Sequence, residues 1–476
     1  MSASEIRLPG FLAVVVVAAL PVTAADIDAR IQRVEQGLRP GAAISGQPQP
    51  KWTIRERLRF YKVPGVSVAV IAKGRVEWAR GYGVVAENGK PVDAQTLFQA
   101  ASVSKPVASM VALRLVDEGK LSLDEDVNLK LRSWKVPEDE FTKTQKVTLR
   151  RLLNHSAGLT VHGFGGYAAD EPVPSLLDIL DGKKPANSAP IRVDITPGTQ
   201  GRYSGGGYEV MQQLVMDVTG KPFPQLAQEF VLGPLGMTRS TYQQPLPAHL
   251  KANAAAGHGN DGVMLKGRWH TYPEMAAAGL WTTPSDLARF VHELQKGGRV
   301  LQPATQREML TKVLGDYGLG LGLSETAGHK SFSHGGSNAG FKCTLFGYLD
   351  SGSGAVVMTN GDGGSALADE ILRSISAEYE WADYRTKERT IARVQPDVLQ
   401  AYAGLYVLAP GLEVTVTYEN ERLFAATQGK KVELFPESPT SFFSVEADVP
   451  PIRFTRASDN SVEMSAGGAT AKRQGR

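Results

Sequence analysis

The chain has 476 residues, of which 42% are hydrophobic and 21% are charged, and its formal net charge is +3. This composition is that of a globular protein and excludes a disordered chain, while the length favours more than one domain. The single cysteine, Cys343, excludes an internal disulfide framework and a cysteine-rich metal site. No block of like charges stands out, so nothing indicates a nucleic-acid groove or a polybasic membrane patch.

The first 25 residues have the pattern of a secretory signal peptide. Arg7 precedes an apolar run at 11–20, and small residues follow as far as Ala24 and Ala25. Such a run is too short to cross a bilayer, which takes about 20 residues. We therefore expect cleavage near Ala24 or Ala25, a periplasmic or secreted protein, and no stable membrane anchor after cleavage. The alternative is a buried or anchoring N-terminal helix. A lipoprotein anchor is excluded because no cysteine follows the run.

The next segments predict a helix and then a hairpin. Apolar residues at helical spacing predict a helix over 26–38. A polar stretch at 45–51 leads to a short basic helix. Residues 63–82 change to a period of two around a turn at Lys73-Gly74, which predicts a β-hairpin.

Three helices are predicted in the middle of the chain. Residues 106–116 are almost all apolar, which indicates a helix inside the protein, and Gly119 follows where it should end. A second helix covers 211–218 and closes at Gly220. The third opens at Pro284 and continues to Leu294.

Strands are expected again at 331–334, 343–349 and 354–359. The order of strands, many helices and then strands favours an α+β fold, in which one sheet joins both ends of this region.

The pattern of hydrophobic residues in the sequence changes after about residue 390. Short alternating segments recur and a turn is expected at 419–421, which together predict a small antiparallel barrel or sandwich of about 80 residues. Pro396 is a suitable boundary. We therefore divide the chain into a signal peptide (1–25), a main domain (26–390) and a small C-terminal β domain (391–476).

Several common catalytic templates are absent from the sequence. No serine stands in G-x-S-x-G, and neither H-E-x-x-H nor G-x-x-x-x-G-K-[ST] occurs. The eight histidines are scattered without metal-ligand spacing. We expect neither a metal nor a cofactor.

One serine and lysine pair lies at the start of a predicted helix, where it could carry out chemistry. Ser102 lies directly before the predicted apolar helix and Lys105 follows three residues later, so both side chains project from one face of the first turn. The helix N-terminus offers free N–H groups and a positive dipole there, which suit a developing oxyanion. A capping serine beside a solvated lysine is the simpler interpretation. However, a lysine at the start of a wholly apolar helix should be partly buried.

Two further segments carry polar groups on a glycine-rich backbone. Residues 197–205 bring Tyr203 onto a loop before a helix. Residues 334–341 begin with His334 and continue through a Gly-Gly pair that ends a strand. Taken alone, a loop tyrosine indicates packing and a Gly-Gly pair indicates a turn.

Together, and in this order, the three segments resemble those of the serine β-lactamase and penicillin-recognising family. The branch most similar includes class C β-lactamases, D-stereospecific peptidases and related esterases. The resemblance implies an antiparallel sheet flanked by helices with a helical subdomain, and the C-terminal segment resembles the lipocalin-like barrel appended to some members. It covers roughly residues 53–375, and further blocks carry it at 63–68, 152–159, 233–238, 279–287 and 317–320.

By this resemblance, Ser102 is the nucleophile, Lys105 its activating partner and Tyr203 the shared general base and acid, while His334 lines the substrate. Serine attacks a carbonyl only if its proton is removed as the bond forms. Lysine and tyrosine both ordinarily have a pKa near about 10, so their surroundings must change it for either to act near neutrality. The two should titrate as a pair.

The resemblance also implies an oxyanion hole made by two backbone N–H groups, each able to contribute about 3 kcal/mol of transition-state stabilisation. The residues expected to bind the oxyanion or the substrate are Ser102, Ser337, Gly335, Gly336, Gly205 and Asn338.

The sequence departs from the family pattern at two positions. Gly205 stands where the family usually carries an asparagine that contacts the lysine and the substrate amide. His334 stands where lactamases often present a lysine, and a mostly neutral imidazole attracts a carboxylate less strongly. Both departures favour a peptide, amide or ester substrate over an antibiotic.

The sequence thus predicts an exported serine hydrolase that acts through an acyl-enzyme on a small molecule or short peptide. The alternatives are a class C-like β-lactamase proper, or a catalytically weak penicillin-binding sensor. For the C-terminal segment, binding of a small apolar ligand and assembly into a homo-oligomer stay open.

Overall fold

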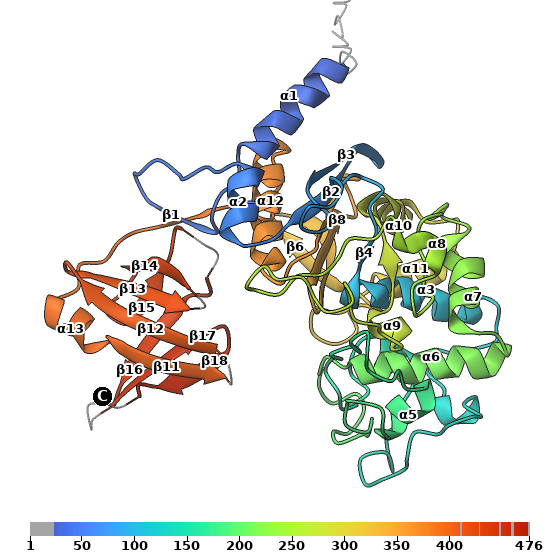
Figure 1. Ribbon diagram of the computed structural model, residues 1–476. Helices are drawn as coiled ribbons and strands as arrows, with labels where there is room; N and C mark the ends of the chain where they lie inside the picture. The colour runs from blue at the N-terminus through green and yellow to red at the C-terminus, as the bar shows by residue number, and fades with distance from the viewer. Residues whose placement is uncertain (1–22, 410–411, 428, 447–448, 458–460, 475–476) are drawn as a thin grey trace, which may run out of the picture.

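A computed structural model describes residues 23–409, 412–427, 429–446, 449–457 and 461–474 of the chain. The predicted signal run at 11–20 lies outside these residues. The described chain forms a large part that combines a sheet with helices and, beside it, a small all-β part (Figure 1). Within these residues, no helix has both the length and the apolar character needed to span a bilayer.

A six-stranded antiparallel sheet forms the centre of the large part, which confirms the predicted fold class. Its strand order is β3-β2-β9-β8-β7-β6, so strands from both ends of the large part lie side by side. The strands are β2 (Gly65–Ala72), β3 (Arg75–Gly83), β6 (Gly322–Thr326), β7 (His329–Asn338), β8 (Phe341–Tyr348) and β9 (Gly354–Thr359).

The predicted hairpin is present as β2 and β3, but both faces of β2 are buried. Val66 and Val68 pack into one hydrophobic cluster, with α1 and α12, whereas Ala69 and Ile71 pack into a second cluster with the helical region. In a half-exposed strand, buried and exposed side chains alternate. A strand between two layers of helices is covered on both faces, and every residue of β2 is accordingly buried.

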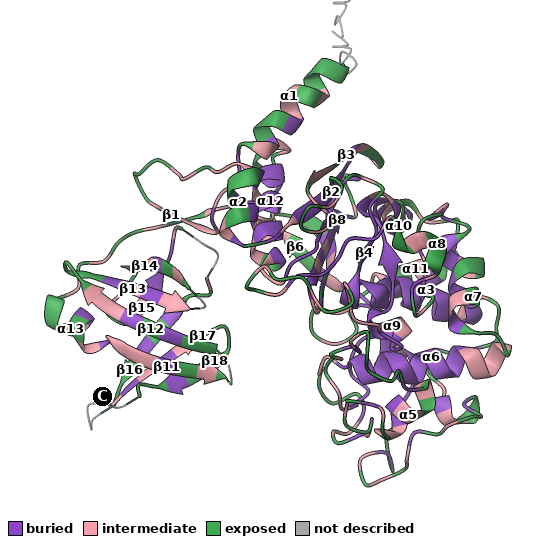
Figure 2. Cartoon of the chain, in the orientation of Figure 1, coloured by how far each residue is buried: buried purple, intermediate pink, exposed green. Residues whose placement is uncertain are grey.

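Helices cover both faces of the sheet, and the interior ones are buried over most of their length (Figure 2). On one side lie α1 (Ala24–Glu35), α2 (Ile54–Phe60) and α12 (Gly364–Glu378). On the other lie α3 (Ser104–Asp117), α4 (Leu149–Leu153), α5 (Leu176–Asp181), α6 (Gly205–Thr219), α7 (Phe223–Ala227), α8 (Ala248–Lys251), α9 (Met275–Ala278), α10 (Pro284–Lys296) and α11 (Pro303–Met309).

The ends of the predicted helices are mostly where the sequence indicates. Gly119 follows α3 with φ +67° and Gly220 caps α6 with φ +70°. The first helix is an exception, because it stops at Glu35 and not at residue 38. Leu38 instead forms a bridge with Trp52.

Short strands outside the main sheet were not predicted. The parallel pair β1 (Ala42–Ile44) and β10 (Lys387–Arg389) joins segments that are far apart in the sequence. Likewise, β4 (Phe98–Gln99) pairs with β5 (Trp281–Thr282) just before the Ser102 turn.

The Gly-Gly pair after His334 is not a turn, contrary to the prediction for an isolated pair. Strand β7 continues through both glycines to Asn338, and the chain reverses at Ala339-Gly340, where Gly340 has φ +72°. The physical reason is a close contact described with the site below.

The C-terminal part is a nearly closed eight-stranded antiparallel barrel, preceded by α13 (Pro396–Ala401), which starts at the predicted boundary residue. Its first and last strands meet, since Gln474 N–H donates to Leu405 O. Side chains that include Tyr406, Phe442 and Phe454 form one hydrophobic cluster. The strands are β11 (Gly404–Ala409), β12 (Leu412–Glu419), β13 (Arg422–Thr427), β14 (Lys430–Pro436), β15 (Ser441–Phe443), β16 (Ile452–Arg456), β17 (Val462–Ala466) and β18 (Ala469–Lys472).

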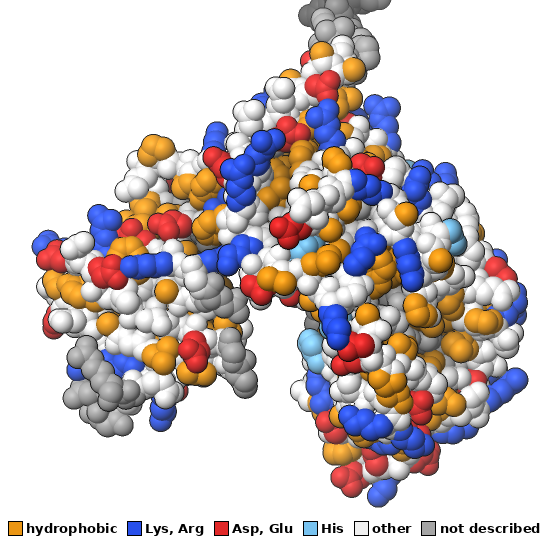
Figure 3. Space-filling model, viewed as in Figure 1, with side chains coloured by type: hydrophobic (Ala, Val, Ile, Leu, Met, Phe, Trp, Pro, Cys, Tyr) orange, Lys and Arg blue, Asp and Glu red, His pale blue; other side chains and the backbone are white. Residues whose placement is uncertain are grey.

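Positive and negative side chains are interspersed over the face of the molecule seen in Figure 3. This mixture agrees with the small net charge and the absence of charge blocks in the sequence.

Candidate active site

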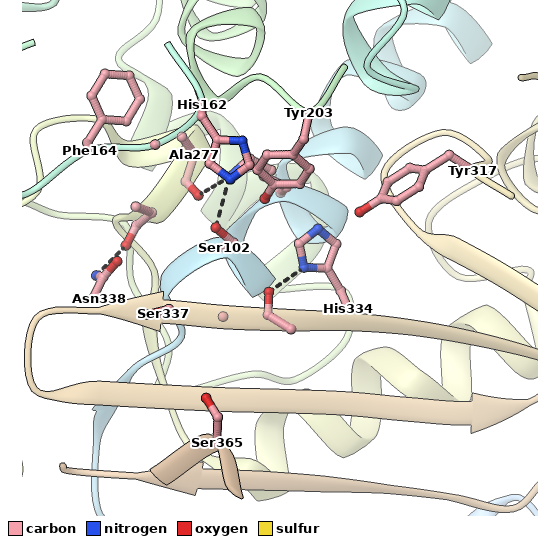
Figure 4. Close-up of a pocket in the computed structure, with 15 residues that line it drawn as sticks. Ser102, His162, Phe164, Tyr203, Ala277, Tyr317, His334, Ser337, Asn338 and Ser365 are labelled. Atoms are coloured by element: carbon pink, nitrogen blue, oxygen red, sulfur yellow. Dashed lines mark hydrogen bonds between the residues drawn. The ribbon is translucent and has the colours of Figure 1, made fainter. Parts of the chain in front are cut away.

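Ser102 lies in a short 3₁₀ turn, η1 (Ala101–Val103), that leads directly into α3. The preceding residue, Ala101, has φ +50°, a left-handed conformation that is unfavourable for alanine and typical of strained functional turns. The turn directs Ser102 toward a cavity of about 840 Å³. Figure 4 shows Ser102 at its centre, above β7.

Lys105, one helical turn later, is buried at 1% exposure beside Ser102. Its Nζ lies 3.0 Å from Ser102 Oγ and donates to Ala277 O at 2.9 Å. Burial lowers the pKa of Lys105 to about 7, although the charge of Glu209 acts in the opposite direction. A substantial fraction of this amine is therefore neutral at pH 7 and able to accept a proton.

Tyr203 lies beside Lys105 at the cavity, two residues before the start of α6. Lys105 Nζ is 4.9 Å from the centre of its ring. Burial raises the pKa of Tyr203 to about 12, while a hydrogen bond with Ser102 opposes the rise. The phenol therefore carries its proton at neutral pH. The ring of His155 lies 4.2 Å away, centre to centre, and fixes one face of Tyr203.

His334 projects from β7 toward the same cavity and is neutral. Its Nδ1–H donates to Gly335 O at 2.7 Å. Burial, reinforced by the charge of Lys105, lowers the pKa of His334 to about 3. His334 therefore contributes a neutral ring to the cavity.

The glycines after His334 let β7 approach the Ser102 turn. A Cβ at Gly336 would lie 2.2 Å from Ala100 O, so no side chain fits there. Gly335 and Ser337 are exposed and line the cavity. The strand thus brings its backbone at Ser337 to the cavity that Ser102 also lines.

The remaining two predicted binding residues occupy structural positions. Asn338 is buried, and its side-chain amide donates to Gln99 Oε1 at 2.8 Å and to Ala278 O at 3.1 Å, at the edge of the cavity. Gly205 is buried beneath Phe164 and is not among the residues that line the cavity.

Two side chains of α6 hold the segment that binds Lys105. Glu209 Oε1 accepts from Ala277 N–H at 3.1 Å, and Gln212 Oε1 accepts from Ala276 N–H at 2.8 Å. Glu209 is fully buried, and burial raises its pKa well above the usual range of a carboxyl. Ala277 therefore contacts Glu209 through its N–H group and Lys105 through its carbonyl group.

Several residues at the cavity or beside it stand outside the three motifs and have no predicted role. His155 and Tyr317 belong to blocks that had been recognised only as family-like, whereas the other three have no distinguishing local pattern. Of these residues, His155 packs against Tyr203, while the cavity lining includes His162, Phe164, Tyr317 and Ser365.

The side chains at the cavity form a set suited to acyl transfer. A serine hydroxyl contacts an amine that is partly neutral, and a protonated phenol lies beside both, as nucleophilic catalysis requires. Among the residues that the structure describes, no group of three or more His, Cys, Asp or Glu side chains could hold a metal ion.

Residues 52–380 match the protein-family model described as Beta-lactamase. Penicillin-binding protein 4* of Bacillus subtilis is 24% identical over 389 residues, which cover 76% of this chain and 83% of the relative. Esterase EstB of Burkholderia gladioli is 30% identical over 191 residues, 38% of this chain and 48% of the esterase. The octameric penicillin-binding protein homologue from Pyrococcus abyssi superposes with a TM-score of 0.61 at 21% identity, covering 88% of this chain and 98% of that one.

Proposed function

Because the chain belongs to the beta-lactamase family, we propose that it is an exported serine hydrolase with Ser102 as its nucleophile. The observation that carries the proposal is the 3.0 Å contact between Ser102 Oγ and a fully buried amine, that of Lys105. The lowered pKa of Lys105 supports it, since a neutral amine can accept the serine proton near pH 7.

Acylation uses the three polar side chains together. Ser102 Oγ attacks the carbonyl carbon of the substrate while its proton passes to Lys105. The backbone N–H groups of Ser102 and Ser337 stabilise the oxyanion that forms. Tyr203 then gives its proton to the leaving group as the carbonyl re-forms, and the proton on Lys105 replaces it. The products of this half-reaction are the ester on Ser102 and the protonated leaving group.

Deacylation reverses these roles with water in place of the leaving group. The pair of Tyr203 and Lys105 takes a proton from the attacking water, and Ser102 Oγ recovers a proton as the acid is released. The packing of the tilted His155 ring against Tyr203 supports the orientation that both half-reactions need.

For the substrate we propose an ester, amide or short peptide of the D-amino-acid type. The neutral state of His334 supports this preference, because it supplies no positive charge to bind a substrate carboxylate. The similarity to an esterase agrees with it. A weak penicillin-binding sensor, or a class C-like β-lactamase, is the second candidate, which the similarity to a penicillin-binding protein favours.

A turnover panel tests the proposal. Wild-type protein and Ser102→Ala are compared on p-nitrophenyl acetate, p-nitrophenyl butyrate, D-alanyl p-nitroanilide and nitrocefin. We expect multiple turnovers on at least one ester or amide and none with Ser102→Ala. Turnover that survives in Ser102→Ala would refute the assignment, whereas one adduct per wild-type molecule without turnover would favour the sensor.

The proposal also covers export, the domain limits and the role of the C-terminal barrel. We propose that residues 1–25 are removed on export and that 26–390 form the hydrolase domain. The barrel (391–476) is proposed to be lipocalin-like and to mediate self-association, since the archaeal homologue is octameric. Light scattering of the full-length protein decides between monomer and oligomer.

A further inference from the structure

Phe164 forms one wall of the cavity that contains Ser102. In Figure 4 its ring lies on the side where β7 ends at Asn338, while Tyr317 and His334 bound the opposite side. Ala277 and Ala278 also line the cavity. The half of the cavity nearest Phe164 therefore presents the Phe164 ring, with the polar side chain of Asn338 at the end of β7.

The segment that carries Phe164 is held against the N-terminus of α6. Gly205 N–H donates to His162 O and Gly206 N–H donates to Val161 O, each at 3.0 Å. A Cβ at Gly205 would lie 3.0 Å from the Phe164 ring and 3.1 Å from His162 O. Glycine at 205 is thus what allows Phe164 to come so close to the helix.

The other end of the same segment is tied to β7. The Tyr272 hydroxyl donates to Gly165 O at 3.2 Å and accepts from Ala339 N–H, in the turn after β7, at 3.0 Å. Asn187 Nδ2 donates to Gly166 O at 2.9 Å. Phe164 is therefore held from both sides before any substrate enters, which lowers the cost of ordering it on binding.

The arrangement around Ser102 indicates which part of a substrate meets this wall. Tyr203, the proposed proton donor to the leaving group, lies between Ser102 and Tyr317 (Figure 4). The leaving group then departs on the Tyr317 side, with the oxyanion directed to the backbone of Ser337. The remaining substituent on the acyl carbon points to the opposite side, toward Phe164.

We propose that Phe164 is a specificity-determining residue that receives the acyl side chain and selects aromatic or extended apolar acyl groups over small ones. The proposal rests on the proposed function, because it needs an acyl group on Ser102. The Phe164 proposal concerns only the relative rates of different substrates. Its test is therefore distinct from the test that identifies Ser102 as the nucleophile.

The test is a series of p-nitrophenyl esters that share one leaving group and differ only in the acyl part: acetate, butyrate and phenylacetate. With Phe164→Ala we expect kcat/KM for phenylacetate to fall about tenfold relative to acetate, because an apolar contact is lost. Phe164→Leu should retain most of the rate on butyrate while losing about threefold on phenylacetate relative to butyrate. Leu177→Ala, at an exposed apolar residue outside the cavity, is the matched control and should leave the ranking unchanged.

Active sites are counted with a fluorophosphonate, so a variant that folds poorly changes the active fraction and not the ranking. Equal losses on all three esters, or an unchanged ranking in both Phe164 variants, would overturn the proposal. Ser102→Ala is run in parallel. If it abolishes hydrolysis while the ranking stays constant in the Phe164 variants, only this inference fails. If hydrolysis survives Ser102→Ala, the proposed function fails, and this inference fails with it.

Discussion

Lys105 is the residue on which the proposed chemistry depends most. Its amine is buried among a hydroxyl, a carbonyl and the faces of two tyrosine rings, at distances of 4.9 Å from Tyr203 and 5.7 Å from Tyr208. These groups stabilise a cation less than bulk water does, which is why the pKa of Lys105 falls to about 7.

The pH dependence of kcat/KM follows from this pKa. In the proposed mechanism the neutral amine is the active form, and its fraction rises with pH through the pKa. We therefore expect kcat/KM for an uncharged ester to rise to a plateau with a midpoint near 7. Tyr203, with a pKa of about 12, keeps its proton over this whole range. A profile that is flat from pH 5 to 9 would contradict this assignment. Lys105→Arg, which cannot lose its proton, should reduce kcat about 10²–10⁴-fold.

Gly205 is a second residue whose close contacts lead to a specific prediction about stability. An alanine Cβ there would contact both the Phe164 ring and His162 O, and the carbonyl is held by its own hydrogen bond to residue 205. We expect Gly205→Ala to reduce the free energy of unfolding by about 1–2 kcal/mol in urea titrations. Phe164→Ala in the same chain should relieve part of that loss.

Gly201→Ala is the control for this experiment, because a Cβ at Gly201 would meet open space. It should change stability by less than about 0.5 kcal/mol. A loss at Gly201 equal to that at Gly205 would show that packing against Phe164 is not the cause.

The residues of the candidate site could be predicted to unequal degrees. Ser102, Lys105, Tyr203 and His334 all line one cavity, and each stands in a short motif. Phe164 could not be predicted, because its place depends on Val161, which adopts φ +64° without being a glycine. No local sequence pattern predicts a positive φ at a valine.

At the scale of elements, α6 and α9 together hold the amine in place. Glu209 and Gln212 project from one face of α6 and accept from consecutive N–H groups of α9. The carbonyl of Ala277 then points at Lys105. We therefore propose that Glu209 is a positioning residue, which acts on Lys105 through the backbone of Ala277.

Substitution of Glu209 separates this role from simple packing. Glu209→Gln keeps an oxygen that accepts from Ala277 N–H and resembles the protonated acid favoured by burial, so kcat should stay within about threefold of wild type. Glu209→Leu removes the acceptor, and kcat should fall about tenfold or more with little change in KM. Equal effects of the two substitutions would refute a role through the backbone of Ala277. Glu229→Gln, at an exposed carboxylate, is the control.

The elements themselves were predictable where their pattern is local. The hairpin of β2 and β3 has a turn signal, and α3 is an apolar run ended by a glycine. The course of β7 was not predictable, because Gly336 is required by contact with Ala100, more than 200 positions away. The pairing of β1 with β10 likewise joins distant segments.

At the scale of the whole molecule, a buried ion pair lies where the sheet-containing part meets the barrel. Arg57 makes two hydrogen bonds to Glu370 on α12, at 2.6 and 2.7 Å, and a third to Glu446 O in the C-terminal part. Tyr61 donates to the same carboxylate at 2.6 Å. The change in hydrophobic pattern near residue 390 predicted a separate β part, but this contact could not be predicted, because its members are spread over the chain.

Removal of the charge on Glu370 should destabilise the protein strongly. Glu370→Gln leaves the buried Arg57 without its counter-charge, and we expect a loss of about 3–5 kcal/mol of unfolding free energy. Denaturant titration measures it. Glu229→Gln, which breaks an exposed pair with Lys221, should cost no more than about 1 kcal/mol. Equal small losses would show that the buried pair adds nothing to stability.

The most direct measurement is the site of the acyl group in a quenched reaction. Wild-type protein is mixed with p-nitrophenyl butyrate, stopped in acid within the first turnover and digested for peptide mass mapping. We expect a butyryl group on the peptide that contains Ser102, and no such group in Ser102→Ala. A butyryl group on another residue, or the same modification in Ser102→Ala, would contradict it.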